Sequence, residues 1–336
     1  MRTKLVRLAI GVVVGLALLG ASAPDSAAQP KVYKIRFGNS QGAGDATADT
    51  MAGFKKEVEA KSNGQLQVEL YPSGQLGKIE EVVEMLRSGA VHIHVNSPQY
   101  LAKWLPEIQV TSLPFLFDSP EAADRALDGS FGTDLKAKIQ EKTDFVILGF
   151  EEFGFKNVFN RRRPVTTMED LKGLKLRVIA SPVTLRTFQA LGASPVGMAF
   201  SEIYSAMQTG VIDGAELPFT SILGVKLHEV TKYISTTGHF FEIALVVGSK
   251  TALNALPPDL RKIVTDASLT MAAEARRTSR ASQATARAFM AGRGVEINDI
   301  APAEIARMRA AVAPVYDWAR QQWGEDVSKV LKAVGR

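Results

Sequence analysis

The 336-residue sequence contains no cysteine and only four histidines. The lack of cysteine excludes disulfide bonds, thiolate zinc sites, iron–sulfur clusters and a cysteine nucleophile from this sequence. The chain is 46% hydrophobic and 22% charged, which is too apolar for a disordered protein, and its glycines show no collagen-like period. Since single cores seldom grow beyond about 250 residues, we expect a folded protein with two domains.

The hydrophobic run near the start is too short to span a membrane. Leu8–Leu19 contains twelve apolar or glycine residues, whereas a bilayer core needs about 20. Basic residues precede this run, and small residues follow it up to Ala28. The pattern predicts a secretory signal peptide over residues 1–28 and an exported mature protein, with cleavage near Ala28 or, alternatively, after Ala23. A permanent membrane anchor is the competing interpretation.

The basic character of the chain comes partly from this segment. Residues 1–28 hold Arg2, Lys4, Arg7 and Asp25, so their removal lowers the net charge from +5 to +3. The run at 161–163 is three adjacent arginines without interleaved aromatic residues, which is typical of a solvated loop. We therefore expect no nucleic-acid partner.

Strand-like and helix-like patterns alternate along the mature chain. Residues 32–37, 66–70 and 91–95 predict strands, and the segments between them carry apolar residues at helical spacing. A second cycle begins after a strand at 145–150, with further strands at 158–160, 175–179, 233–237 and 243–248. This order predicts an α/β fold with mixed, mostly parallel sheets flanked by helices.

One helix is expected to be unusually long. Residues 259–290 contain neither glycine nor proline and are rich in alanine and arginine. At 1.5 Å per residue, a helix of about thirty residues is about 45 Å long. Because that exceeds the width of one small domain, we expect the helix to lie along both domains.

Two short motifs permit chemistry but have simpler explanations. Gly38-Asn39-Ser40-Gln41-Gly42 matches the G-x-S-x-G pattern of serine hydrolases, although it follows the first mature strand, earlier than that fold places it. His92 and His94 share one strand face but have no nearby carboxylate pair to complete a metal site. An ordinary loop and strand packing are the simpler interpretations. The sequence carries neither a P-loop nor a dinucleotide fingerprint, so we expect no metal and no cofactor.

Arg177 is a stronger candidate for a binding residue. It lies in a strand whose Leu174, Leu176 and Val178 point to the opposite face. An inward-facing guanidinium must satisfy five N–H donors, and a carboxylate does so through two parallel hydrogen bonds. The partner is either the carboxylate of a ligand or an internal Asp or Glu.

Several longer blocks resemble the DctP-type periplasmic binding proteins of tripartite ATP-independent periplasmic (TRAP) transporters. They are Y-P-S-G-Q-L-G at 71–77, L-P-F-L-F at 113–117, E-D-L-K-G-L-K-L-R-V at 169–178, the block at 191–214 that begins L-G-A-S-P-V, and T-T-G-H at 236–239. The resemblance implies a two-lobed binding protein, not an enzyme. Such a protein closes on a small organic acid and delivers it to the small and large membrane subunits of a permease.

The resemblance also implies the lobe boundaries and the binding residues. One lobe would hold residues 31–154 and 243–282, the other 155–242 and 283–336, in a monomer with the long helix spanning both. The family's carboxylate-clamping arginine falls on Arg177. The other expected ligand-binding residues are Lys156, Asn96, Phe200, Glu216, Leu217, Asn39, Ser40, Phe219 and His239.

Two departures from the family pattern concern the ligand. Lys156 stands where an arginine is common, and Leu217 stands where an asparagine is common. Leu217 presents apolar surface, and a polar ligand group facing it would be left unpaired, at about 1–3 kcal/mol. We therefore expect a monocarboxylate with an apolar or aromatic tail, near which Phe153, Phe155, Phe200 and Phe219 would lie. A small dicarboxylate, a keto or hydroxy acid, and an exported hydrolase using Ser40 are the alternatives.

Overall fold

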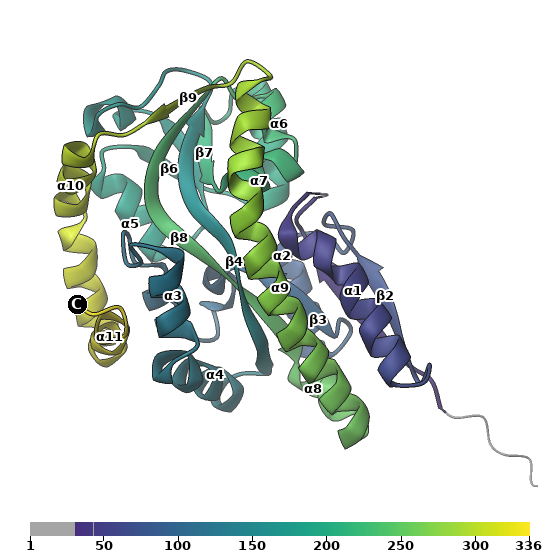
Figure 1. Cartoon of the computed structure of the whole chain (residues 1–336). Coiled ribbons are helices and arrows are strands. Elements are labelled where there is room, and N and C mark those ends of the chain that lie inside the picture. The colour runs from purple at the N-terminus through teal and green to yellow at the C-terminus, as the bar shows by residue number, and fades with distance from the viewer. Residues whose placement is uncertain (1–30, 43) are drawn as a thin grey trace, which may run out of the picture. The chain divides into compact units, whose positions relative to one another are not determined.

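The computed structural model describes residues 31–42 and 44–336 (Figure 1). The predicted signal peptide, residues 1–28, lies outside the described residues. The first part of the described chain is a strand–helix–strand–helix–strand unit. Its elements are β1 (Tyr33–Asn39), α1 (Ala46–Lys61), β2 (Leu66–Tyr71), α2 (Ile79–Ser88) and β3 (Ile93–Asn96). β1 pairs in parallel with both β2 and β3, as the alternating pattern predicted.

Two long antiparallel strands run through the middle of the sheet. β4 (Phe145–Asn160) and β8 (Tyr233–Ser249) pair along almost their whole length. The sequence predicted two shorter strands in place of each, because the charged pair Glu151-Glu152 and the glycines at 154 and 238 resemble breaks. In the structure both glutamates are buried and β4 continues through register shifts, with Gly154 at a φ of +107°.

The second α/β unit supplies the other side of the same sheet. It contains β5 (Lys175–Val178), α5 (Pro182–Ala190), β6 (Ser194–Gly197), α6 (Ile203–Thr209), β7 (Gly214–Leu217) and α7 (Phe219–Gly224). The strand order is β2-β1-β3-β8-β4-β7-β5-β6, and β9 (Glu296–Asp299) pairs with β8. Parallel and antiparallel pairs thus form one mixed sheet with flanking helices, and the predicted fold class is confirmed.

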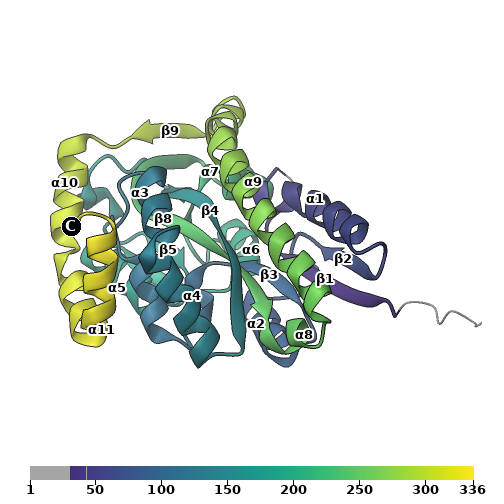
Figure 2. The ribbon, with the colours of Figure 1, turned by 60° about the horizontal axis from the view of Figure 1, so that its bottom comes forward.

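The remaining helices cover the faces of this sheet. They are α3 (Pro120–Leu127), α4 (Ser130–Lys142), α8 (Lys250–Asn254), α10 (Pro302–Ala311) and α11 (Ala313–Ala333). Short 3₁₀ helices lie at Pro98–Leu101, Pro106–Ser112, Met168–Leu171, Phe200–Glu202 and Leu227–Glu229. In Figures 1 and 2, α10 and α11 lie on the side of the sheet away from α1 and β2.

Helix α9 (Pro258–Ala291) is the long helix that the composition predicted. It packs against α1 of the first unit, against β4 and against α7 of the second unit, and both views show it crossing the sheet (Figures 1 and 2). Its Val264, Ala267 and Met271 are buried with Phe37 of β1 and Phe54 of α1. The helix therefore contacts both α/β units, while the exact lobe boundaries stay a prediction.

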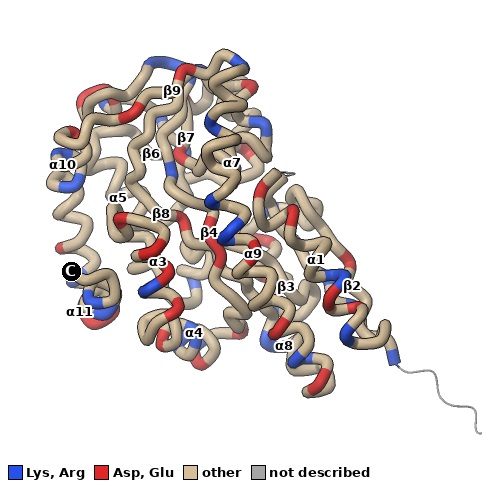
Figure 3. Tube along the Cα trace, viewed as in Figure 1, with Lys and Arg blue, Asp and Glu red and all other residues tan. Residues whose placement is uncertain are grey.

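Charges of both signs are interspersed along the chain (Figure 3). Each arginine of the run at 161–163 has a partner within the protein. Arg161 donates a hydrogen bond to the Met207 carbonyl at 2.7 Å, and Arg162 forms an ion pair with Asp213 at 3.0 Å. Arg163 donates to the carbonyls of Asp170 and Lys172. These arginines close a turn after β4.

Candidate functional site

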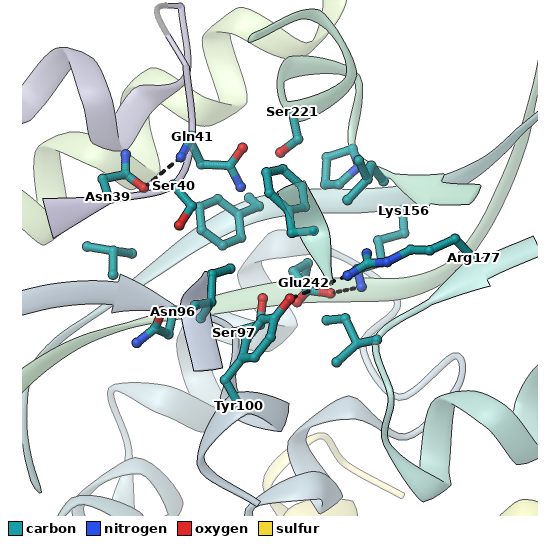
Figure 4. A pocket seen from close by; sticks show the side chains of 17 residues that line it. Asn39, Ser40, Gln41, Asn96, Ser97, Tyr100, Lys156, Arg177, Ser221 and Glu242 are labelled. Atoms are coloured by element: carbon teal, nitrogen blue, oxygen red, sulfur yellow. Dashed lines mark hydrogen bonds and ion pairs between the residues drawn. The ribbon is translucent and has the colours of Figure 1, made fainter. Parts of the chain in front are cut away.

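A buried cavity of about 30 Å³ lies where the parallel strands β1, β3, β5 and β7 end. Ligands commonly bind at this position in α/β folds, because loop amides and helix N-termini are exposed there. Phe153 and Lys156 of β4 and Glu242 of β8 contribute to its walls, and Figure 4 shows the side chains that surround it. The residues that line it are Asn39, Ser40, Gln41, Ile79, Val95, Asn96, Ser97, Tyr100, Phe153, Lys156, Arg177, Ile179, Phe200, Leu217, Pro218, Ser221 and Glu242.

Arg177 presents a buried cation to this cavity. Its side chain is 1% exposed. Nε donates to the Met198 carbonyl at 2.8 Å, one terminal nitrogen lies 3.4 Å from the Tyr100 hydroxyl, and the guanidinium lies over the Phe200 ring. Among the described residues, no carboxylate lies within 4 Å of the guanidinium. The remaining N–H donors can therefore hold a ligand carboxylate.

Lys156, in contrast, is already paired with two carboxylates. Its Nζ lies 3.2 Å from Oε2 of Glu216 and forms a second, short ion pair with Glu242. Burial acts against the lysine charge, but the two glutamates outweigh it and raise the pKa of Lys156. Lys156 does reach the cavity, yet its charge is balanced within the protein.

Glu216 and His239 lie behind Lys156 and do not line the cavity. Nε2 of His239 lies 3.4 Å from Oε2 of Glu216, and Nδ1 lies 2.8 Å from the Thr237 hydroxyl. Burial lowers the pKa of His239, and this favours the neutral ring. Burial of Glu216 favours its neutral form, but Lys156 outweighs that effect and lowers the pKa of Glu216. Glu216 thus pairs with the buried Lys156, and His239 contacts Glu216, on the side of the lysine away from the cavity.

Glu242 is a cavity residue that the sequence reading missed. It lies on β8 and is 4% exposed, and its carboxylate contacts Lys156 and the Ser97 side chain, whereas no hydrogen bond of regular geometry reaches its Oε1. Burial raises the pKa of Glu242, against the opposing effect of Lys156. An acidic residue inside the apolar run F-F-E-I-A-L-V-V is a signal that could have found it.

Several neutral polar atoms in the cavity also lack partners. They include Nδ2 of Asn39, both amide atoms of Asn96, Oε1 of Gln41 and Oγ of Ser221, and all four side chains are buried. Oδ1 of Asn39 accepts a hydrogen bond from the Gln41 backbone at 3.1 Å, which orients the amide. Since buried polar atoms are almost always hydrogen-bonded in native structures, these atoms provide binding capacity for a polar ligand.

Seven of the ten predicted binding residues line the cavity: Asn39, Ser40, Asn96, Lys156, Arg177, Phe200 and Leu217. The other three do not. Glu216 and His239 lie behind Lys156, and Phe219 is buried with the Arg287 guanidinium 5.9 Å from its ring centroid. Of the further aromatic candidates, Phe153 lines the cavity, whereas Phe155 packs edge-on against Phe241.

A larger cavity of about 250 Å³ adjoins the first and shares Ser40, Ile79 and Phe200 with it. Much of its lining is apolar, with Ile203, Tyr204, Val225 and Leu227 among its walls, and Lys78 lies at its edge. Lys78 is paired with Glu202 at 2.6 Å. The first cavity, here called the inner chamber, is lined by the charged residues Lys156, Arg177 and Glu242, and the second, the outer chamber, provides additional volume beside it.

The structure gives little support to a hydrolase site at Ser40 or to a metal site at His92 and His94. Ser40 has no hydrogen bond to a histidine among the described residues. The Nδ1 atom of His92 accepts from the Arg36 backbone, and His94 is fully buried, so burial lowers its pKa to about 4. No group of three or more His, Asp or Glu in residues 31–42 and 44–336 is arranged to hold a metal ion. In the same residues, no helix is both long and apolar enough to span a membrane.

Comparison with known proteins identifies the family. Residues 37–322 match the sequence model of DctP, bacterial extracellular solute-binding protein family 7. The 2,3-diketo-L-gulonate-binding periplasmic protein of Escherichia coli is 32% identical over 68% of this chain and 69% of its own length. The C4-dicarboxylate-binding periplasmic protein of Rhodobacter capsulatus is 31% identical over 98% of both chains.

A solved structure agrees with this match. The sugar acid binding protein of Advenella mimigardefordensis, in complex with galactonate, superposes with a TM-score of 0.88 and 31% identity, covering 91% of this chain and 98% of that one. The sequence match and the fold thus agree over nearly all of the described residues. The chain belongs to bacterial extracellular solute-binding protein family 7, the DctP family of TRAP transporter binding proteins.

Proposed function

We propose that this protein captures an organic acid in the periplasm, clamps its carboxylate with Arg177 and delivers it to the membrane subunits of a TRAP permease. The observation that carries the proposal is the buried Arg177 guanidinium, which faces a cavity and has no internal carboxylate partner. An unpaired buried charge is costly, and a bound carboxylate removes that cost. The relatives bind acids too: a diketo sugar acid, C4-dicarboxylates and galactonate.

The ligand that we infer is a monocarboxylate with an apolar or aromatic tail. Arg177 can hold the carboxylate, while the Lys156 charge is already balanced by Glu216 and Glu242. Leu217 supplies apolar surface in the inner chamber, and the outer chamber has room for a tail. A small dicarboxylate and a keto or hydroxy acid remain the competing ligands.

Capture would occur by closure of two lobes around the acid. The cavity walls come from both α/β units, and contacts cross between them at the Lys78–Glu202 ion pair. A ligand that contacts both walls binds the closed form more tightly than an open one, so it shifts the population toward closure. We propose that the monomeric protein, cleaved near Ala28, presents this closed surface to the permease.

Isothermal titration calorimetry on the purified mature protein tests the clamp. Phenylacetate, galactonate and succinate serve as probes, compared between the wild type and Arg177→Ala and Arg177→Lys variants. We expect Arg177→Ala to weaken binding of the preferred acid at least about tenfold, and Arg177→Lys to weaken it less, since a point charge replaces a bidentate donor. Unchanged affinity in a correctly folded Arg177→Ala variant would refute the proposal.

A further inference from the structure

Two buried carboxyl groups meet at the start of α1, outside the cavity. Asp45 is the N-cap of α1, Glu151 lies on β4, and each residue is 1% exposed. Both carboxyl groups bind Thr47: Asp45 accepts from its backbone N–H at 3.0 Å, and Oε2 of Glu151 accepts from its hydroxyl at 2.7 Å. Thr47 thus connects the start of α1 to β4 through two carboxyl groups.

No cation balances this pair. Among residues 31–42 and 44–336, no Lys, Arg or His lies within 4 Å of either carboxyl group. The charges that act on the pair are Asp49 of α1, which adds a negative charge near Asp45, and Arg276 of α9, which is itself paired with two other aspartates. Oε1 of Glu151 has no hydrogen-bond partner. Two buried carboxylates without a cation are unfavourable together, so the pair retains a proton.

The pair also determines where the cavity loop lies. Residues 39–41 line the cavity, and the Asp45 backbone N–H donates to the carbonyl of Gly42, directly after them, at 3.2 Å. Glu151 lies on the same strand as Phe153, which lines the cavity from β4. The bonds through Thr47 therefore fasten the cavity loop to the strand beside which the ligand would lie.

Ionisation of both groups works against this attachment. The two negative charges repel each other, and each gains hydration only if the start of α1 moves away from β4. The loop at 39–42 moves with it, because it is bonded to Asp45. A ligand that contacts the loop in its fastened position favours the protonated pair, so ligand binding and proton binding are linked.

We propose that Asp45 and Glu151 form a pH-sensitive switch: when the pair holds its proton, the cavity loop is fastened to β4 and the acid binds tightly, and when the pair is fully ionised, the loop is released and binding weakens. This inference rests on the proposed function only in requiring an acid in the cavity, and it does not depend on Arg177. Burial raises the pKa of Asp45 to about 7 and that of Glu151 to about 8. The affinity is therefore complete at acidic pH and is lost as the pH rises through these values.

Calorimetry between pH 6 and pH 9 tests the switch on the mature protein. The probe is whichever of phenylacetate, galactonate and succinate binds the wild type most tightly. We expect the wild type to bind it at least about fivefold more weakly at pH 9 than at pH 6, since a pKa difference of one unit between the free and bound forms changes affinity about tenfold. Titrations in buffers of different ionisation enthalpy should show net proton uptake on binding near pH 8.

Glu151→Gln and Asp45→Asn are the test variants, because both keep an acceptor for Thr47 without a charge and Asn is a good N-cap. We expect both to match the wild type at pH 6, to change less than about twofold up to pH 9, and thus to bind more tightly than the wild type at pH 9. A merely structural role would weaken binding at every pH. Asp49→Asn is the matched control: it removes an exposed carboxylate from the same helix and should keep the wild-type profile.

Three results would overturn the switch: a wild-type affinity that does not change with pH, the same pH profile in the wild type and both neutral variants, or weaker binding of both folded variants at pH 6 and pH 9 alike. If binding is still lost in Arg177→Ala in any of these cases, the proposed function survives. A pH profile that follows the expectation while Arg177→Ala binds normally would refute the clamp and leave the switch supported. If none of the three acids binds at any pH, both proposals fail.

Discussion

A Cβ atom placed on Gly42 would lie 2.0 Å from the carbonyl oxygen of Gly224. Gly42 follows β1 in the loop that carries Asn39, Ser40 and Gln41 into the cavity, and Gly224 ends α7, just after the cavity residue Ser221. The two walls of the cavity are therefore in backbone contact at this point. Only glycine permits so close an approach.

A side chain at position 42 should accordingly oppose closure. We expect Gly42→Ala to weaken ligand binding at least about tenfold, because the added methyl group must push the loop away from α7. The melting temperature without ligand should change little, since the loop is separate from the apolar core. Calorimetry and thermal unfolding measure the two quantities. Gly53→Ala is the control, because a Cβ atom there meets nothing within 4 Å; equal effects of both substitutions would contradict the prediction.

Leu217 offers a test of the apolar tail. The side chain is 6% exposed and lines the inner chamber. We expect Leu217→Asn to weaken phenylacetate or mandelate binding and to strengthen galactonate binding, since the amide adds a donor and an acceptor to the chamber. Without ligand, the variant should lose about 1–3 kcal/mol of stability from the unpaired amide. Leu217→Met keeps the apolar volume, so a galactonate gain in that variant as well would count against this explanation.

The Lys78–Glu202 ion pair predicts a salt dependence of binding. The pair spans 2.6 Å between residues that begin α2 and precede α6, and both side chains are about half exposed. Each partner shifts the pKa of the other toward its charged form, upward for Lys78 and downward for Glu202. Exposed pairs contribute little, so we expect Lys78→Ala to weaken ligand binding by about twofold to fivefold at low ionic strength and less at high.

A second surface pair provides the control for that experiment. Lys103 lies 2.7 Å from Glu84, away from either cavity. Lys103→Ala should leave ligand affinity unchanged at every salt concentration. An affinity loss in Lys78→Ala that is independent of salt would indicate that the lysine stem, rather than its charge, holds the walls together.

Two buried carboxyl groups predict a pH dependence of stability. Burial raises the pKa of Asp45, the N-cap of α1, to about 7 and that of Glu151 on β4 to about 8. Oε2 of Glu151 accepts a hydrogen bond from the Thr47 hydroxyl at 2.7 Å. The folded protein therefore binds more protons than the unfolded chain, whose carboxyl groups titrate near pH 4. Their stabilising contribution is complete below about pH 4 and is lost as the pH rises to about 8.

Removing one of these groups should flatten that profile. We expect Glu151→Gln to raise the melting temperature at pH 8 relative to the wild type and to change it little at pH 5. Differential scanning calorimetry across this range measures the effect, with the surface substitution Glu141→Gln as the control. A melting temperature that falls more steeply toward alkaline pH in the variant than in the wild type would have the opposite sign and would refute the prediction.

The sequence could indicate that Arg177 is an inward-facing residue, because this information lies in a local pattern; its binding role stays a prediction. An arginine inside an apolar strand needs a partner wherever the strand lies, and both faces of β5 are in fact buried, with Leu176 and Val178 inaccessible. The start of α5 is also set locally: the Ser181 side chain accepts a hydrogen bond from the Thr184 backbone, as an N-cap does, and Pro182 follows it.

The cavity position of Glu242 and the pairing of Lys156 with two carboxylates could not be predicted locally, because both depend on the register between strands that are distant in sequence. Lys156 pairs with Phe240 across β4 and β8, and Glu216 comes from β7 on the other side of β4. These partners lie about 60 to 90 residues apart in sequence, so no local pattern joins them. The buried glutamates of β4 also concealed the length of that strand, because their partners lie on α1 and α9.

The pairing of β4 with β8 determines how the cavity walls can part. Paired residues run from Phe145 and Ser249 at one end to Asn160 and Tyr233 at the other, directly beneath the ligand chamber. Any opening must therefore bend a hydrogen-bonded ribbon rather than unfold a loose linker. The three register shifts and Gly154 interrupt the regular pairing, so we expect any bend to occur there. If the walls part as proposed, we expect the β4–β8 ribbon to bend as a unit, so that the two strands keep their register when the walls close again.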